Sequence, residues 1–233
     1  PELVFTPQII SDIFLGTITQ WNDAKIAAAN PRVSLPDLAI AVVRRSDGSG
    51  TTFTFTDYLT RISTTWKDKV GRGTSVNWPT GVGAKGNPGV AGLVKQLPGS
   101  FGYVELIYAL QNKLSFASVV NRKGAVVKPS LASTAAAANT ALPDDMRVMV
   151  TDTDAVDGYP IAGFTWILLY REQNYGNRSL EKAQAVAKMV WWMTHEGQKY
   201  AEELHYARLT PAAVARAETL LKSLTYKGTA LLK

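Results

Sequence analysis

The sequence has no cysteine among its 233 residues and only two histidines. The absence of cysteine excludes disulfides, thiolate metal sites and cysteine nucleophiles. No apolar run approaches the length of about 20 residues that a membrane-spanning helix needs. His195 and His205 lie near or within the C-terminal helical stretch, and neither is spaced with an acid and a nucleophile in a recognisable pattern. We therefore expect no metal site, no cofactor and no catalytic histidine.

Long basic runs are also lacking, although the net charge is +6. The 25 lysines and arginines are scattered, and no basic run is longer than a pair. A surface that follows nucleic-acid phosphates would gather these residues into a stripe, so we expect no nucleic-acid partner. The hydrophobic fraction of 46% and the charged fraction of 19% are those of an ordinary globular protein, whose length allows one or two domains.

Periodicity and capping signals predict a chain in which helices separate strands. Residues 38–43 and 161–170 are near-continuous apolar runs, typical of strands buried on both faces. We also expect a strand at 101–105, a hairpin within 114–128 and a loop from 70 to 89. Helices are expected at 7–15, 25–30, 88–97, 107–111, 130–142, 179–196 and 210–224, with another beginning at Ser49. This order predicts an α/β protein with a largely parallel sheet.

The stretch VVRRSDGSGTTF places a concentration of polar groups between the first buried strand and the next helix. A helix N-terminus offers unpaired backbone N–H groups and a partial positive charge, which together stabilise an anion. Gly48 and Gly50 let the backbone approach a ligand closely, and Ser49 and Thr51 add hydroxyl donors. An arginine at the strand end can donate two parallel hydrogen bonds to an oxyanion.

Asp47 is well placed to orient that arginine and is not expected to face the anion. Donors that arrive from many directions suit a tetrahedral oxyanion better than a carboxylate. The simpler alternative is that Ser49 only caps the helix while Arg44 or Arg45 forms a surface ion pair. The residues by themselves leave both interpretations open.

Other nucleotide and nucleophile motifs fit poorly. No lysine follows Gly50, as a P-loop would require, and the nucleophile-elbow pattern fails because glycines flank Ser49 directly. Residues 81–86 match G-x-G-x-x-G, with Glu105 about twenty residues later, as in a dinucleotide site. The preceding residues 77–80 make a poor buried strand, so we do not favour that interpretation. Val190, Trp191, Trp192 and Met193 are expected to form a core-facing stripe of their helix.

Three segments together resemble the periplasmic phosphate-binding proteins of bacterial phosphate ABC transporters: VVRRSDGSGTTFTFTDYL, WPTGVGAKGNPGVAG and PGSFGYVELIYAL. The early segment DIFLGTITQWNDAKIAAANP and the late segment WWMTHEGQKYAEELHYARL fit the same family. The resemblance runs essentially from end to end. It also implies that the segment containing residues 81–86 serves no nucleotide.

The resemblance implies a type II-like periplasmic-binding fold of two lobes with a hinge. Residues 1–158 would form the second lobe, and residues 159–233 would return to complete part of the first. Inorganic phosphate would be bound between the lobes and delivered to a membrane ABC permease, without enzymatic activity. The family's phosphate ligands fall on Arg45, Ser49, Gly50 and Thr51, with Asp47 pairing the arginine and Arg44 away from phosphate. The alternative is an enzyme that uses this site for a small phosphorylated substrate.

The family also has an N-terminal segment that these residues lack, so the first lobe is expected to be incomplete here. That segment holds a Thr-Phe turn, a serine-rich turn and an aspartate that accepts the proton of hydrogen phosphate. Pro1 is an unusual first residue, and we expect the segment in the same or a separate chain. The groups identified here are nearly all donors, which cannot distinguish phosphate from sulfate, so selectivity is expected to depend on that aspartate. The resemblance places the protein in the periplasm, at the cell surface or outside the cell.

Overall fold

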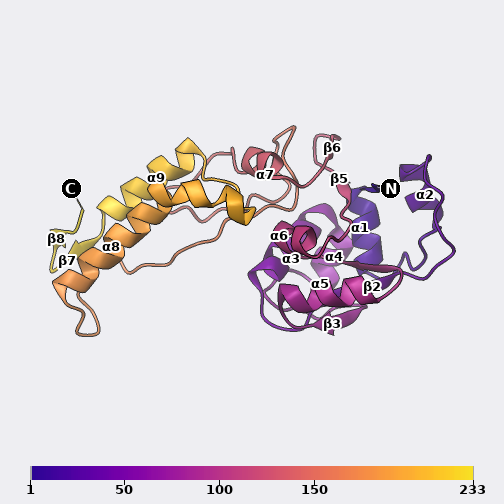
Figure 1. Cartoon of the computed structure of the whole chain (residues 1–233), viewed down its shortest axis with the longest axis horizontal. Helices are drawn as coiled ribbons and strands as arrows, with labels where there is room; N and C mark the ends of the chain where they lie inside the picture. The colour runs from indigo at the N-terminus through magenta and orange to yellow at the C-terminus, as the bar shows by residue number, and fades with distance from the viewer. Residues whose placement is uncertain (1, 233) are drawn as a thin grey trace.

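The computed structural model describes residues 2–232; residues 1 and 233, the outer ends of the two predicted lobes, lie outside this range. Figure 1 shows an N-terminal body, residues 2–137, and a C-terminal helical arm, residues 171–232, which a long irregular crossing segment joins. In the described part of the chain no helix has the length and hydropathy required to cross a membrane.

The central sheet of the body is parallel and has the order β3-β2-β4. Its middle strand β2 (Ala41–Arg45) is flanked by β3 (Val82–Ala84) and β4 (Ser100–Gly102). Helix α3 (Gly50–Ile62) follows β2, and α5 (Gly86–Gln96) follows β3. This confirms the predicted α/β class. The carboxyl end of β2 and the N-terminus of α3 meet at one edge of the sheet, where ligands bind in open α/β sheets.

A second small sheet joins the start of the chain to the predicted hairpin. Strand β1 (Val4–Phe5) lies parallel to β5 (Ser118–Val120), which pairs antiparallel with β6 (Val126–Val127). The Asn121 side chain accepts hydrogen bonds from the backbone N–H groups of Lys123 and Ala125, and Gly124 has φ +80°. These contacts close the turn where the sequence predicted it.

The shorter helices of the body are α1 (Pro7–Phe14), α2 (Ala24–Ala29), α4 (Thr64–Lys69), α6 (Leu106–Gln111) and α7 (Leu131–Ala137). A side chain caps each of them except α6, and α4 was not predicted as a separate helix. Thr6 caps α1 before an N1 proline, and Asp23 caps α2. Ser130 forms a capping box with Ser133 at α7.

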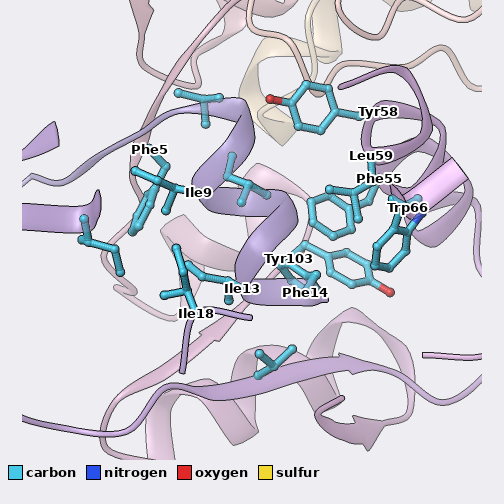
Figure 2. Packing of buried hydrophobic residues seen from close by; sticks show 14 residues of the cluster. Phe5, Ile9, Ile13, Phe14, Ile18, Phe55, Tyr58, Leu59, Trp66 and Tyr103 are labelled. Atoms are coloured by element: carbon cyan, nitrogen blue, oxygen red, sulfur yellow. The ribbon is translucent and has the colours of Figure 1, made fainter. Parts of the chain in front are cut away.

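An aromatic cluster holds the end of β2 against α1 and α3. The Phe14 ring contacts Phe55 edge-on at 4.7 Å between centroids, and Phe55 stacks on Tyr103 at 4.5 Å. Figure 2 shows these rings beside Trp66, whose side chain is fully buried. Burial of several large rings stabilises the body by several kcal/mol, on the order of 1.5–3 kcal/mol for each fully buried large side chain. The cluster therefore supplies a rigid support for the residues that follow β2 and β4.

The arm consists of two packed helices and short flanking elements. Helices α8 (Leu180–Thr194) and α9 (Pro211–Lys222) lie side by side (Figure 1), with Ala187, Val190, Leu221 and Leu224 buried between them. Between them come the 3₁₀ turns η1 (Glu196–Tyr200) and η2 (Glu202–Leu204), and the hairpin of β7 (Thr225–Tyr226) and β8 (Thr229–Ala230) follows. Ser179 and Thr210 are the N-caps, as predicted.

Several predicted elements were wrong in place or extent. Residues 161–170 form no strand: no neighbouring strand pairs with them in the described chain, and the Leu168 side chain is 92% exposed. The strand expected at 38–43 is shifted, because Leu38 and Ile40 bond to the loop after α1 and the sheet begins at Ala41. Leu38 is exposed, so that run is not buried throughout.

The remaining corrections also have local causes. The predicted loop 70–89 contains β3, which pairs with β2, and β4 ends at Gly102 rather than at residue 105. Helix α7 is shorter than the predicted 130–142, since Thr153 donates to the Ala137 carbonyl that a longer helix would use. In α8, Val190 faces the core, whereas Trp192 and Met193 are exposed, so the predicted core stripe is wrong for these two.

Candidate functional site

The N-terminus of α3 has donors available to a ligand. In residues 2–232 the backbone N–H groups of Gly50 and Thr51 have no protein acceptor. The Ser49 Oγ accepts a hydrogen bond from the Thr52 N–H at 3.1 Å, so Ser49 caps the helix, as the simpler alternative proposed. Capping uses a lone pair of this hydroxyl and leaves its hydrogen free to be donated. The capping and anion-binding interpretations of Ser49 are therefore compatible.

Arg45 is held beside this helix end by a bidentate pair with Asp47. Arg45 Nε and Nη2 donate to the two Asp47 carboxylate oxygens at 2.8 and 2.7 Å, and the Gly86 N–H donates to Asp47 at 3.0 Å. The hydrogen bond from Arg45, followed by that from Gly86, holds the pKa of Asp47 well below its ordinary value. Asp47 correspondingly raises the pKa of Arg45. The pair fixes the position of the guanidinium at the strand end.

Arg44 points elsewhere. Its Nη1 donates to the Arg45 carbonyl at 3.4 Å, on the side of the strand where Gly83 leaves room for it. Arg44 and Asp47 do not line the cavity described below, whereas Arg45 does. This arrangement agrees with the alternation of side chains along a strand.

A hydrogen-bonded chain continues from Arg45 to the arm. Arg45 Nη1 donates to Asn87 Oδ1 at 3.1 Å, and Asn87 Nδ2 donates to Thr51 Oγ1 at 3.3 Å. Thr51 Oγ1 donates to Glu105 Oε1 at 3.1 Å. The hydroxyl of Tyr206, which lies in the arm, donates to Glu105 Oε2 at 2.6 Å, and this bond raises the pKa of Tyr206 to about 12.

These groups line a cavity of about 1320 Å³. The cavity brings together all four sequence-predicted ligands, Arg45, Ser49, Gly50 and Thr51. Its volume exceeds the range of about 300–1,000 Å³ typical of small-molecule pockets, so a single tetrahedral anion would occupy only a small part of it. The rest of the lining includes apolar side chains such as Phe5, Phe14 and Phe101.

Sequence reasoning missed Asn87, Glu105 and Tyr206. The sequence suggests Glu105 only as the acid of a dinucleotide site, but β3 lies inside residues 81–86 and not before them, so the first two glycines form no turn between a strand and a helix. The dinucleotide interpretation is therefore wrong. Glu105 instead precedes α6 without capping it, which leaves its carboxylate free to meet Thr51. Asn87 had a local signal, since Gly86-Asn87-Pro88 opens a helix.

Comparison with known proteins identifies the family of this chain. Residues 2–195 match the family described as the PBP superfamily domain. The chain belongs to this family. The predicted resemblance is also confirmed by relatives named phosphate-binding protein PstS. That of Xylella fastidiosa is 46% identical over 220 residues, covering 93% of this chain and 59% of the relative, and that of Pasteurella multocida is 41% identical over 225 residues, covering 95% and 64%.

The chain thus spans about three fifths of the length of these PBP-family relatives. Solved structures share its fold. A periplasmic phosphate-binding protein (PfluDING) with bound phosphate matches with a TM-score of 0.67 at 21% identity, covering 94% of this chain and 65% of that one. The phosphate-binding protein from Stenotrophomonas maltophilia matches with a TM-score of 0.62 at 19% identity, again covering 94% and 65%.

Proposed function

We propose that this protein binds inorganic phosphate at the N-terminus of α3 as the substrate-binding component of an ABC transporter. The observation that carries the proposal is the pair of unpaired N–H groups at Gly50 and Thr51, beside an arginine that Asp47 holds in place. A tetrahedral oxyanion there receives backbone, hydroxyl and guanidinium donors together. The names of the relatives support phosphate as the anion.

We further propose the lobe arrangement expected from the resemblance. Residues 1–158 carry the anion site in one lobe, and residues 159–233 contribute to the other, with a periplasmic location and a membrane ABC permease as partner. Groups from outside these 233 residues, in the same or a separate chain, complete the site and the first lobe. The greater length of the relatives and the exposed Leu168 and Tyr170 side chains support this completion.

Binding without catalysis is the role that we favour over action on a small phosphorylated substrate. An enzyme would need a general base within hydrogen-bond reach of its nucleophile. In the described chain no carboxylate or imidazole bonds to the Ser49 hydroxyl, and its oxygen accepts from a backbone amide. Incubation with a chromogenic phosphate ester separates the two roles: turnover that is lost in Ser49→Ala would overturn the binding proposal.

Titration calorimetry with inorganic phosphate tests the proposal directly. Saturable binding that weakens in Arg45→Lys is expected. The proposal would be contradicted if the folded protein, completed with the segments by which its relatives are longer, did not bind phosphate. Sulfate, a tetrahedral dianion like hydrogen phosphate, and nitrate, a planar monoanion, serve as competing anions.

A further inference from the structure

One hydrogen bond joins the arm to the body. The hydroxyl of Tyr206 in the arm donates to Glu105 Oε2 at 2.6 Å, and in the described part of the chain no other hydrogen bond links residues 171–232 to residues 2–137. Residues 138–170, which lie between them, form no helix or strand (Figure 1). Because no continuous secondary structure fixes the arm against the body, its position depends on side-chain contacts.

The turn that carries Tyr206 is itself fixed to the rest of the arm. The Tyr206 backbone N–H donates to the Ala201 carbonyl at 2.9 Å, and the Leu209 N–H donates to Gln198 Oε1 at 2.8 Å. His205 has the left-handed conformation, with φ +59°, that turns the chain at the end of η2. Tyr206 lines the cavity from this braced turn. A movement of the arm would therefore carry the Tyr206 hydroxyl with it.

On the side of the body, the Glu105 carboxylate is shared between the arm and the anion site. Glu105 Oε1 accepts from Thr51 Oγ1 at 3.1 Å, while Oε2 accepts from Tyr206. Glu105 precedes α6 without capping it, so both of its oxygens are available for these contacts. The raised pKa of Tyr206 keeps its hydroxyl protonated, and hence a donor, at neutral pH. A single carboxylate thus connects the arm to the N-terminus of α3.

The other side chain that ties the arm down does so away from the site. Arg216 donates to Asp144 Oδ1 at 2.6 Å and to the Leu142 carbonyl at 3.5 Å, and both acceptors belong to the crossing segment. None of these three residues lines the cavity. Arg216 therefore attaches the arm to the crossing segment, whereas Tyr206 attaches it to the body beside the anion site.

We propose that the Tyr206–Glu105 hydrogen bond is a latch that holds the arm against the body and slows the release of bound phosphate. The inference rests on the proposed phosphate-binding function. The bond exists only while the arm lies on the body, so it stabilises that arrangement relative to one in which the arm has moved away. It uses no oxygen of the anion, and its loss leaves the donors of α3 in place. Its effect therefore falls on dissociation more than on association.

The test measures release from the protein completed with the segments by which its relatives are longer. The protein is loaded with radiolabelled phosphate, and an excess of unlabelled phosphate is then added. Tyr206→Phe removes only the hydroxyl and should raise the dissociation rate about tenfold, the lower end of the effect of a hydrogen bond to a charged group, because Tyr206 is 46% exposed. The association rate should change by no more than about twofold.

Two substitutions in the arm serve as controls. Tyr200 is as exposed as Tyr206, but its hydroxyl has no hydrogen-bond partner among residues 2–232 and it does not line the cavity. Tyr200→Phe should leave the dissociation rate unchanged. Arg216→Gln removes the ion pair with Asp144 and should alter that rate by no more than about twofold. If either control raised the rate as much as Tyr206→Phe does, the latch would be overturned.

A double-mutant cycle shows whether Tyr206 acts through Glu105. Glu105→Ala removes the acceptor, so adding Tyr206→Phe to this variant should raise the dissociation rate no further. Additive effects of the two substitutions would contradict the latch, because they would mean that the hydroxyl acts on another group.

A cross-link at the same two positions gives an independent measurement. Because these 233 residues include no cysteine, Glu105→Cys with Tyr206→Cys introduces a single pair of thiols. The unbridged pair should release phosphate rapidly, and bridging it with a short bis-maleimide after phosphate is bound should trap the anion. The same bridge between Asp144→Cys and Arg216→Cys should leave release unchanged. Rapid exchange of phosphate in the protein bridged at the latch would overturn the proposal.

The latch and the proposed function fail in different ways. A dissociation rate that is the same in wild type and Tyr206→Phe overturns the latch and leaves phosphate binding intact. Failure of the folded, completed wild-type protein to bind phosphate removes the proposed function itself. If the cysteine pair does not fold, as judged by thermal unfolding, Tyr206→Phe and its Tyr200→Phe control still decide the question.

Discussion

The Arg45 guanidinium donates from Nε and Nη2 to both carboxylate oxygens of Asp47, two residues further along the chain. This fork-to-fork pairing fixes the plane of the guanidinium, which a single hydrogen bond would not do. The Arg45 side chain is only 10% exposed, whereas that of Asp47 is 32% exposed, so the guanidinium is the shielded member of the pair. The remaining N–H groups of Arg45 are thereby directed to Asn87 and the cavity.

Replacing Arg45 by lysine should weaken phosphate binding about tenfold or more, although the positive charge is kept. Lysine supplies a point charge and cannot make the planar contacts with Asp47 and the anion together. The matched control is Arg44→Lys, which should alter the dissociation constant by no more than about twofold, as most substitutions away from a site do. Calorimetric titration that gave the reverse order would show that the two arginines are assigned wrongly.

Gly50 provides a test that separates ligand crowding from protein packing. A Cβ at Gly50 would meet no protein atom within 4 Å, and the same is true of Gly92 in α5. Gly50→Ala should therefore leave thermal stability unchanged or slightly raised, yet weaken phosphate binding by crowding the anion. Gly92→Ala should change stability similarly and binding not at all. Equal phosphate affinity in both variants would mean that the anion does not approach the α3 backbone.

Ser49 and Ser63 cap successive helices in the same way. Each Oγ accepts from the backbone N–H three residues later, at 3.1 Å for Ser49 and 3.2 Å for Ser63. Replacing either by alanine should lower the free energy of unfolding by about 1 kcal/mol. Only Ser49→Ala should also weaken phosphate binding, because Ser63 lies outside the cavity lining. If Ser49→Ala and Ser63→Ala lost phosphate affinity to the same extent, in proportion to their loss of stability, Ser49 would have only a capping role.

The His195–Glu218 contact should make the arm more stable in mild acid. His195 Nε2 lies 3.1 Å from Glu218 Oε1, and this hydrogen bond raises the pKa of His195. The stabilisation is fully present below the unfolded histidine pKa of about 6.5 and is lost as pH rises through the higher folded value. It should not exceed about 1 kcal/mol, since the pair is partly exposed.

Thermal unfolding of His195→Gln, compared with that of the wild type, measures the stabilisation by the His195–Glu218 contact. The difference in melting temperature should be larger at pH below the histidine range than above it. His205→Asn is the control, because asparagine tolerates the left-handed backbone at that position and His205 has no such partner among the described residues. A pH-independent difference would exclude the ion pair as its source.

The sequence predicted the strand, turn and helix around Ser49 because each signal there is local. An apolar run, a capping serine and flanking glycines act within a few residues of one another. The same local reasoning grouped Thr51 with an arginine at the strand end, the family resemblance singled out Arg45, and both residues line one cavity. Local reasoning could not place the partners of Thr51, since Asn87 and Glu105 are 36 and 54 residues away along the chain. Contacts at such separations depend on how the sheet assembles.

The error at residues 161–170 has the opposite cause. The run is apolar and β-prone, but a strand exists only when a neighbour accepts and donates its backbone hydrogen bonds. In the described chain no such neighbour lies beside it, and Leu168 and Tyr170 are exposed. The local composition therefore favours a strand at residues 161–170, but without a neighbouring strand these residues form irregular structure.

The stacking of Trp78 on Tyr103 gives the site an optical readout. The two rings lie 5.7 Å apart between centroids at 25°, and the Tyr103 hydroxyl accepts from the Arg45 backbone N–H at 3.3 Å. We expect an anion that binds Arg45 to alter the surroundings of the Trp78 indole, because only the Tyr103 ring lies between the two residues. Intrinsic tryptophan emission should thus follow phosphate titration without any attached dye, and Trp78→Phe should remove most of the signal while binding persists.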